Sequence, residues 1–335
     1  MLRRRGLSGL FGVVLASCAA VPGSTGGRPA YGTAPSCARR TTVARSERPA
    51  DGDTLTPDQI GAMLRDFAAR LRARYGSTDE HALAAAHRIP PRIVVPLWFH
   101  VLTDGQNGRL SRAAVEQQVA VLNAAYGGRL AGAARSTARR VQAADTGVSF
   151  RLDGADETTN VQWFQRPHDY RIPIEAALAR GGPGTLNLYT AAVGFDMLGF
   201  STFPQWARGR PGLGGVVVDY RSLPGGTFPH FNRGLTAAHE IGHWLGLFHT
   251  FENGCQPPGD GVDDTPYEAL PTIGCPVSKK TCPGPGTDPV HNIMDYAFDS
   301  CMWEFTPGQG RRIRAMLALY RIGVPASSAR QATYR

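Results

Sequence analysis

Apolar residues near the start of the globular part recur every three or four positions. They are Ile60, Met63, Leu64, Phe67 and Leu71. This spacing predicts an amphipathic helix over about residues 57–75, with an apolar face that another part of the chain must cover. Thr56, Pro57 and Gln59 supply an N-cap, a proline for the first turn and the partner of a capping box, so the helix is expected to begin directly after Thr56.

From residue 93 the pattern changes to longer runs of β-branched, aromatic and aliphatic residues. Residues 93–102 are almost continuously apolar, which is typical of a buried central strand. Ser111 is the expected N-cap of a helix whose apolar stripe contains Val115, Val119, Leu122 and Tyr126. Further strands are predicted at 148–152, 186–193, 198–203 and 216–220, and further helices at 174–178 and 311–320. This pattern predicts an α+β fold.

Two stretches lack any apolar period. Residues 19–55 are rich in Gly, Pro, Ser, Thr and Arg, and are predicted to form a tether or an extended pro-segment. Residues 250–305 are rich in Gly, Pro, Asp and Cys, so we expect disulfides or metal ions to hold them rather than a core of their own. The predicted parts of the chain are a signal segment, a tether with pro-segment, one globular domain and a tail: residues 1–18, 19–91, 92–320 and 321–335.

Composition narrows the classes of protein that this chain can be. Apolar residues make up 42% and charged residues 19% of its 335 residues, which excludes wholesale disorder. No stretch approaches the ~18 consecutive apolar residues of a membrane span. The formal net charge is +9, but two thirds of this excess falls before residue 92. Lysine occurs only at Lys279 and Lys280, and there is no basic stripe, so nucleic-acid binding is not expected.

The amino terminus predicts export. Three arginines at positions 3–5 precede an apolar run at 10–16, which is the pattern of a secretory signal. The sequence Leu15-Ala16-Ser17-Cys18 is similar to a lipobox, in which Cys18 would carry a lipid anchor; ordinary cleavage after Ala20 is the alternative. Either route places the chain outside the cell or on the outer face of the envelope, where cysteines pair.

One motif has the spacing of a catalytic metal site. His239 and His243 lie one helical turn apart, so both imidazoles face the same side and can bind one zinc ion. Glu240 is placed beside the metal as a general base for water. Gly246 permits the chain to turn sharply at the end of the helix, which brings His249 to the third ligand position.

Other residues could compete for these roles. Glu268 is the nearest carboxylate that could replace His249 as third ligand, but it lies in a loop beside Pro266, so His249 is favoured. His100 and His230 have no ligand spacing, and we expect both to be core residues with satisfied ring nitrogens.

The loop-rich stretch contains four cysteines and an acidic segment. The cysteines are Cys255, Cys275, Cys282 and Cys301. They allow three disulfide pairings, which we favour over a second zinc site because they lack the close pairs of such sites. The acidic segment at 260–265 offers hard oxygen ligands that suit calcium, although a solvated acidic turn is the alternative.

The chain resembles the pappalysin-like branch of the metzincin zinc endopeptidases, particularly its ulilysin-like and secreted fungal and bacterial members. The resemblance runs from about residue 93 to 309 and rests on the zinc motif and three further segments. These are Gly261-Val262-Asp263-Asp264-Thr265-Pro266, Asp288-Pro289-Val290-His291-Asn292-Ile293-Met294-Asp295-Tyr296, and Cys301 with Glu304-Phe305-Thr306-Pro307-Gly308-Gln309. It implies a two-subdomain catalytic domain, with a twisted mixed sheet and helices above the cleft and a disulfide-stapled loop-rich part below.

The resemblance also implies roles for single residues. Met294 would form a tight methionine turn beneath the zinc, and Tyr296 would donate its hydroxyl to the oxyanion of the reaction. The implied calcium ligands are Asp260, Asp264 and Thr265. The implied disulfides are Cys255–Cys282 and Cys275–Cys301.

Two further residues are assigned from family features. Asp299 would face the pocket for the first residue beyond the cut and favour Arg, or more weakly Lys; an orientation into solvent or a calcium site is the alternative. Cys37 would cap the zinc in a latent precursor, although it lacks the following glycine associated with such switches.

The sequence therefore predicts a monomeric, exported zinc endopeptidase that acts on proteins or peptides. Zinc is its expected catalytic cofactor and calcium a structural one. Substrate is expected to lie extended along an edge strand at 198–203. The alternatives are a surface lipoprotein with structural zinc that binds a partner, and an amidase that acts on a small molecule or cell-wall peptide.

Overall fold

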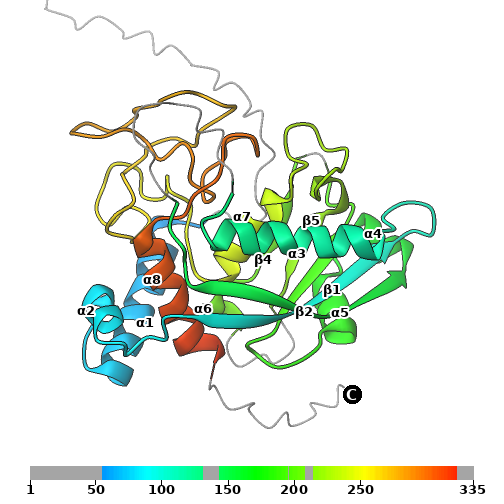
Figure 1. The fold of residues 1–335 in the computed structure, drawn as a ribbon, viewed down its shortest axis with the longest axis horizontal. Coiled ribbons are helices and arrows are strands. Elements are labelled where there is room, and N and C mark those ends of the chain that lie inside the picture. The colour runs from blue at the N-terminus through cyan, green and yellow to red at the C-terminus, as the bar shows by residue number, and fades with distance from the viewer. Residues whose placement is uncertain (1–54, 131–142, 195, 208–213, 323–335) are drawn as a thin grey trace, which may run out of the picture. The chain divides into compact units, whose positions relative to one another are not determined.

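The computed structural model describes residues 55–130, 143–194, 196–207 and 214–322 (Figure 1). Its helices are α1 (Pro57–Tyr75), α2 (Glu80–Ala85), α3 (Arg112–Tyr126), α4 (Val161–Gln165), α5 (Arg171–Leu178), α6 (Pro204–Ala207), α7 (Leu235–Trp244) and α8 (Pro307–Met316). Its strands are β1 (Ile93–Thr103), β2 (Val148–Thr159), β3 (Leu186–Ala191), β4 (Gly199–Ser201) and β5 (Val216–Asp219). Short helical turns η1 (Tyr220–Ser222) and η2 (Leu317–Arg321) follow β5 and α8.

The five strands form one mixed sheet in the order β2-β1-β3-β5-β4. β1 pairs in parallel with β2 and β3, and β3 pairs in parallel with β5. β4 runs antiparallel to β5 at the edge of the sheet. The predictions of a central strand at 93–102 and an edge strand within 198–203 are therefore confirmed.

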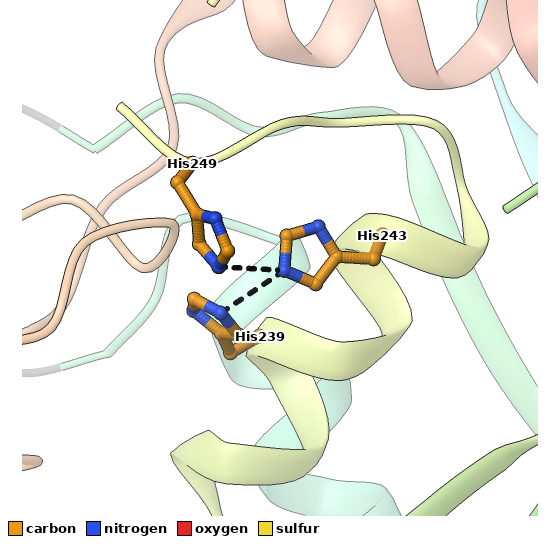
Figure 2. A group of neighbouring side chains, drawn as sticks. All are labelled: His239, His243 and His249. Carbon is orange, nitrogen blue, oxygen red and sulfur yellow. Dashed lines mark hydrogen bonds between the residues drawn. The ribbon is translucent and has the colours of Figure 1, made fainter. Parts of the chain in front are cut away.

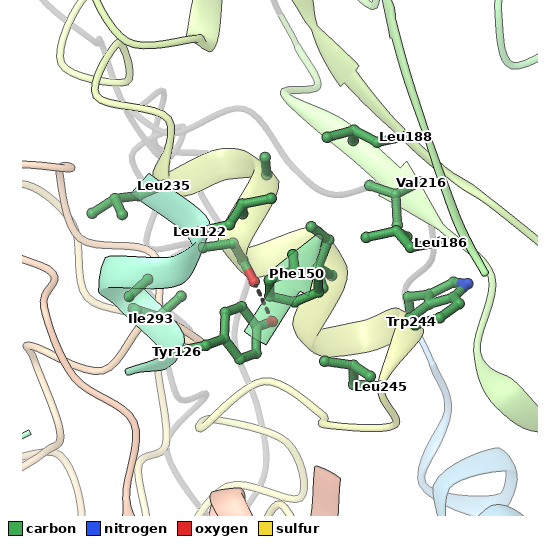
Figure 3. Packing of buried hydrophobic residues seen from close by; sticks show 14 of the residues in the cluster. Leu122, Tyr126, Phe150, Leu186, Leu188, Val216, Leu235, Trp244, Leu245 and Ile293 are labelled. Atoms are coloured by element: carbon green, nitrogen blue, oxygen red, sulfur yellow. Dashed lines mark hydrogen bonds between the residues drawn. The ribbon is translucent and has the colours of Figure 1, made fainter. Parts of the chain in front are cut away.

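Helices α3 and α7 pack on the sheet and share its main core. Figure 3 shows Leu122, Tyr126 and Trp244 among the apolar side chains between these elements. The hydroxyl of Tyr126 donates to the carbonyl of Ala238 at 2.9 Å, and Gln118 Nε2 donates to the carbonyl of Gly234 at 3.0 Å. Helix α3 thus holds α7 by hydrogen bonds at its N-cap and in its first half.

The apolar face of α1 is covered by two parts of the chain. Phe67 and Leu71 lie in one cluster with Ala315 and Met316 of α8. A second cluster, nearer the start of α1, consists of Leu55, Ile60, Met63, Phe203 and Phe248. The predicted capping box is confirmed, because Thr56 and Gln59 each accept from the other's backbone N–H.

Two elements, β2 and α8, differ most from their predicted boundaries. Strand β2 continues to Thr159, beyond the apolar run that ended at 152, because its outer half alternates between exposed and half-buried positions while it still pairs with β1. Helix α8 begins at Pro307 rather than residue 311, with Thr306 and Gln309 forming a second capping box. Helices α2, α4 and α6 were not predicted; each has six residues or fewer.

Residues 250–306 contain turns and loops, as expected, with no helix or named strand among them. Disulfides join Cys255 to Cys282 and Cys275 to Cys301, with Cα–Cα distances of 5.4 and 5.6 Å. The implied crossed pairing is confirmed. The part of the chain that the structure describes has no helix of the length and apolarity that a bilayer span requires. The predicted signal segment, Cys18, Cys37 and most of the tail lie outside the described residues.

Candidate metal centre

Three histidines converge where α7 ends and the chain turns back (Figure 2). Nε2 of His243 lies 3.2 Å from Nε2 of His239 and 3.1 Å from Nε2 of His249. All three residues are at least 95% buried. They form the only group of His, Cys, Asp or Glu residues with metal-site geometry among the described residues.

The outer ring nitrogens fix the orientation of these imidazoles. Nδ1 of His239 lies 2.6 Å from the carbonyl of Ile293, and Nδ1 of His243 lies 2.8 Å from the carbonyl of Leu247. Because a carbonyl can only accept, both Nδ1 atoms donate, and each Nε2 is left with the lone pair that a metal needs.

Their spacing fits zinc. Nitrogen ligands lie about 2.0–2.1 Å from zinc in tetrahedral sites, which places them about 3.3 Å from one another. The Nε2 separations of 3.1 and 3.2 Å are close to that value. Three imidazoles also leave one tetrahedral position open for water or substrate, as catalytic zinc sites do.

The turn that brings His249 to the site depends on Gly246. Its φ is +89°, and a Cβ there would lie 2.7 Å from Cγ of Met316. Both the backbone conformation and the close approach of α8 therefore favour glycine. Glu268, the rival third ligand, instead binds the Lys279 ammonium and the Thr250 hydroxyl.

Glu240 lies on α7 against the edge strand of the sheet. It is 1% exposed. A Cβ on Gly199 of β4 would lie 3.0 Å from Glu240 Oε1 and 2.8 Å from its Cγ. The absence of a side chain at Gly199 thus gives the Glu240 carboxylate its place beside β4.

Met294 and Tyr296 each lie close to an element that carries the histidines. Met294 is fully buried, and a side chain at Gly242 of α7 would collide with its sulfur. The Tyr296 hydroxyl lies 3.2 Å from Nε2 of His249, so it reaches the atoms that would bind the metal. The structure therefore places Met294 against α7 and Tyr296 beside the three histidines.

The residues predicted to bind calcium lie next to the start of α8. Both oxygens of Asp264 accept hydrogen bonds there, from Thr306 Oγ1 at 2.6 Å and from the Gly308 N–H at 2.7 Å. Asp260 is buried and accepts from the Val262 N–H at 2.9 Å, and burial raises its pKa to about 7. Thr265 is also buried.

Asp299 and the two remaining histidines have well-defined surroundings. Asp299 is 3% exposed and its Oδ2 accepts from the Arg233 N–H at 2.8 Å. His100 is buried between Asp156 and Asn187, as predicted. The prediction for His230 is wrong: it is exposed and stacks on Phe298, 4.1 Å between ring centroids.

Sequence reasoning missed two neighbours of the candidate metal ligands. Glu252 Oε1 lies 3.0 Å from Nδ1 of His249, so this ligand has a carboxylate partner where the other two have carbonyls. Phe203, which follows β4, packs beside His243 with 5.2 Å between ring centroids. The position of Glu252 three residues after His249 is a signal that could have identified it.

Comparisons with known proteins agree with this geometry. A family model described as pregnancy-associated plasma protein-A matches residues 199–318. An extracellular metalloprotease of Verticillium alfalfae is 42% identical over 230 residues, which cover 67% of this chain and 76% of the relative. One of Arthroderma benhamiae is 36% identical over 237 residues, covering 69% and 74%.

Solved structures show the same fold. Mature mirolysin of Tannerella forsythia in complex with a cleaved peptide is 27% identical, with a TM-score of 0.58, over 69% of this chain and 96% of that one. A promirolysin mutant is 26% identical, with a TM-score of 0.63, over 80% and 94%. These matches favour the enzyme over the alternative of a non-catalytic lipoprotein. The chain belongs to the pappalysin family of metalloendopeptidases, within the metzincin fold.

Proposed function

We propose that this metalloendopeptidase uses zinc and acts outside the cell on proteins or peptides. The observation that carries the proposal is the convergence of three Nε2 atoms. Backbone carbonyls bound to Nδ1 of His239 and of His243 fix the orientation of those two imidazoles. The names of the extracellular relatives support the location.

Zinc held by His239, His243 and His249 would supply a Lewis acid that polarises the scissile carbonyl and lowers the pKa of water. The other steps belong to the chain. Glu240 would take the proton of the attacking water and pass it to the leaving amine. Its burial against β4 supports this role, because a dry carboxylate beside the bound peptide is a stronger base than a hydrated one.

Tyr296 and β4 would orient the substrate. The Tyr296 hydroxyl, 3.2 Å from Nε2 of His249, would donate to the oxyanion as charge develops there. An extended peptide would add to the sheet along β4, which lies at the edge. Gly199 on that strand would bring the peptide close to the Glu240 carboxylate.

Casein cleavage by wild type and by Glu240→Gln tests this proposal. Loss of the base should lower kcat/KM about 10²- to 10⁴-fold, while bound zinc measured by mass spectrometry stays at one per chain. His239→Ala is the control that should lose both zinc and activity. Equal cleavage by wild type and Glu240→Gln would contradict the proposed base. Activity confined to small amides or cell-wall peptides would favour the amidase alternative.

We propose further that Asp299 selects a basic residue just after the scissile bond. Its burial and its contact with the Arg233 N–H support a fixed carboxylate in the wall of the pocket for that residue, rather than a carboxylate in solvent. A charge-assisted contact with Arg is worth about 1.5–3 kcal/mol, or roughly ten- to a hundredfold in selectivity. A peptide library should show that Asp299→Asn loses a basic preference and keeps overall hydrolysis. An apolar preference in both proteins would refute this role.

The segment before the catalytic domain is proposed to keep the enzyme latent. The proposed boundary is residue 92, and Cys37 would be the zinc-capping thiolate. Cys37→Ala should mature faster than wild type. If it stays equally latent, α1 becomes the better candidate, since its cluster includes Phe248, directly before His249. Mass spectrometry of the mature amino terminus would distinguish lipidation at Cys18 from ordinary cleavage.

Calcium binding at Asp260, Asp264 and Thr265 stays a prediction. The buried Asp260 and Thr265 support it, because a cation would offset the cost of ionising a buried carboxylate. The calcium content of wild type and Asp260→Asn, after dialysis against micromolar calcium, tests it. Equal contents would contradict the assignment.

A further inference from the structure

The two lysines of the chain have different surroundings. Lys280 is exposed, and its ammonium donates to the carbonyl of Gly284. The Lys279 side chain is only 19% exposed, and its ammonium lies among oxygen atoms of the loop-rich part. These are Glu268 Oε1 at 2.6 Å, Thr272 Oγ1 at 3.3 Å, Asp288 Oδ2 at 3.5 Å and the carbonyl of Leu270.

Glu268 is the carboxylate that most needs this ammonium. It is fully buried, and burial, reinforced by the nearby Asp295, raises its pKa to about 7, while Lys279 opposes the rise. Without Lys279, a buried carboxylate would lose its charge partner, which is a strongly destabilising arrangement.

On one side Glu268 holds the loop that carries the third metal ligand. Its Oε2 accepts from the Thr250 hydroxyl at 2.7 Å, and Thr250 directly follows His249. The Thr250 N–H in turn donates to the carbonyl of Met294 at 3.2 Å. The Thr250 side chain thus ties the His249 loop to Glu268, and its backbone ties the loop to the methionine turn.

On the other side Glu268 connects to the residues before Tyr296. Its Oε1 accepts from the Thr272 hydroxyl at 3.1 Å, and the Thr272 N–H donates to Asp295 Oδ1 at 2.9 Å. The same Asp295 oxygen accepts from the Tyr296 N–H at 2.7 Å. One hydrogen bond therefore links the Glu268 carboxylate to Thr250, the residue after His249. Three hydrogen bonds, through Thr272 and Asp295, link it to the Tyr296 N–H.

We propose that Lys279 is a positioning residue of the metal centre: its ammonium holds Glu268 between the His249 loop and the methionine turn, and thereby orients His249 and Tyr296. The proposal rests on the proposed zinc site. It assigns to an internal ammonium the cross-linking task that a bound metal ion performs in other loop-rich domains.

Lys279→Met keeps most of the stem and removes the charge, and Lys280→Met is the matched control. Lys279→Met should weaken zinc binding about tenfold, which is the lower end of the range for mutating groups that orient metal ligands. It should also lower kcat more than it changes KM. Lys280→Met should match wild type in all three quantities. If Lys279→Met behaves like Lys280→Met, the proposal is wrong. Failure of wild type to bind zinc would instead overturn the proposed function.

Two further variants keep the proposal testable if Lys279→Met does not fold. Thr250→Val cuts the link at the opposite end without burying a lone charge, and should also raise the zinc dissociation constant. Glu268→Gln/Lys279→Met removes both charges and keeps an acceptor for Thr250, so it should bind zinc more tightly than Lys279→Met alone, or fold where that variant does not. An unchanged zinc constant in Thr250→Val, or a double variant no better than Lys279→Met, would overturn the proposal.

Discussion

Two regions supply different parts of the candidate metal centre by different means. The sheet region consists of the five strands with α3 and α7, and the loop region consists of residues 250–306. In the sheet region apolar packing surrounds α7, every residue of which is buried, and so places His239, Glu240 and His243. In the loop region two disulfides and a buried ion pair cross-link the part of the chain that carries Met294 and Tyr296.

The difference shows that regular secondary structure and loops are stabilised by different interactions. Strands and helices satisfy their own backbone groups, so apolar burial alone can position their side chains. A loop must find partners for its backbone elsewhere, and the conformational entropy that each ordered residue loses is not offset there by burial in a core. Cross-links and buried charges therefore replace the core in the loop region.

The largest loss of stability should come from the sheet region. Trp244 is fully buried at the end of α7; its indole N–H donates to the carbonyl of Gly214 at 2.8 Å, and the Arg321 guanidinium lies 3.8 Å from the ring centroid. Trp244→Ala should lower the free energy of unfolding by about 3–5 kcal/mol. Urea unfolding should give the same loss with and without reductant. If Trp244→Ala lowers the free energy of unfolding only when the disulfides are intact, apolar packing alone does not stabilise the sheet region.

Removing a disulfide should have the next largest effect, and reductant should mimic it. The Cys255–Cys282 bond spans 27 residues of the loop region, and such a loop contributes about 2–4 kcal/mol. Cys255→Ser/Cys282→Ser should lose this amount in unfolding experiments. Reduction of the variant should then cost less than reduction of wild type. Equal costs would mean that this bond does not hold the loop region.

Sequence predicted the sheet region better than the loop region. The strand at 93–102, the helix with His239 and the turn at Gly246 follow from local sequence patterns: a continuous apolar run, a helical spacing of histidines and a glycine with positive φ. The far half of β2 could not be predicted, because pairing with β1 and not apolar content forms it. Glu268 and Lys279 could not be paired either, since the folded loop alone places the ammonium against that carboxylate.

A single ion pair joins α2 to α8 and to the loop region, and its loss should have an intermediate effect. Glu80 accepts from Arg312 Nε at 3.0 Å and Nη2 at 2.7 Å, while Nη2 also donates to the carbonyl of Gly261. The Arg312 side chain is only 7% exposed. Glu80→Gln should therefore cost about 1.5–3 kcal/mol.

The control for Glu80→Gln is Glu116→Gln, which removes the pair with Arg112 on the exposed surface of α3. Exposed pairs contribute little, so no measurable change is expected there. Similar losses in the two variants would show that burial does not set the strength of the α2–α8 pair. That result would also weaken the case for Lys279, whose argument depends on burial in the same way.

The smallest loss of stability is expected at two capping boxes that share one Thr-Pro-x-Gln pattern. Thr56-Pro57-Asp58-Gln59 begins α1 and Thr306-Pro307-Gly308-Gln309 begins α8, and in both the threonine and glutamine satisfy each other's backbone. The signature predicts the start of α1, whereas the apolar spacing at the second site places the start of the last helix at residue 311, four residues late. The two sites differ at their third residue, Asp58 against Gly308, and in what surrounds them.

The surroundings should separate the two threonines in stability. Thr56 is exposed, and Thr56→Ala should cost about 0.5–1 kcal/mol, the usual contribution of an N-cap. The Thr306 hydroxyl also donates to Asp264, and Gln309 exchanges two hydrogen bonds with Asn292, whose Oδ1 accepts from the Met294 N–H. Thr306→Ala should therefore cost about 1–2 kcal/mol and should slow peptide hydrolysis, which Thr56→Ala should not. Unfolding and kcat measured on both proteins decide the matter, since equal values would mean that the second box caps a helix and does not support the methionine turn.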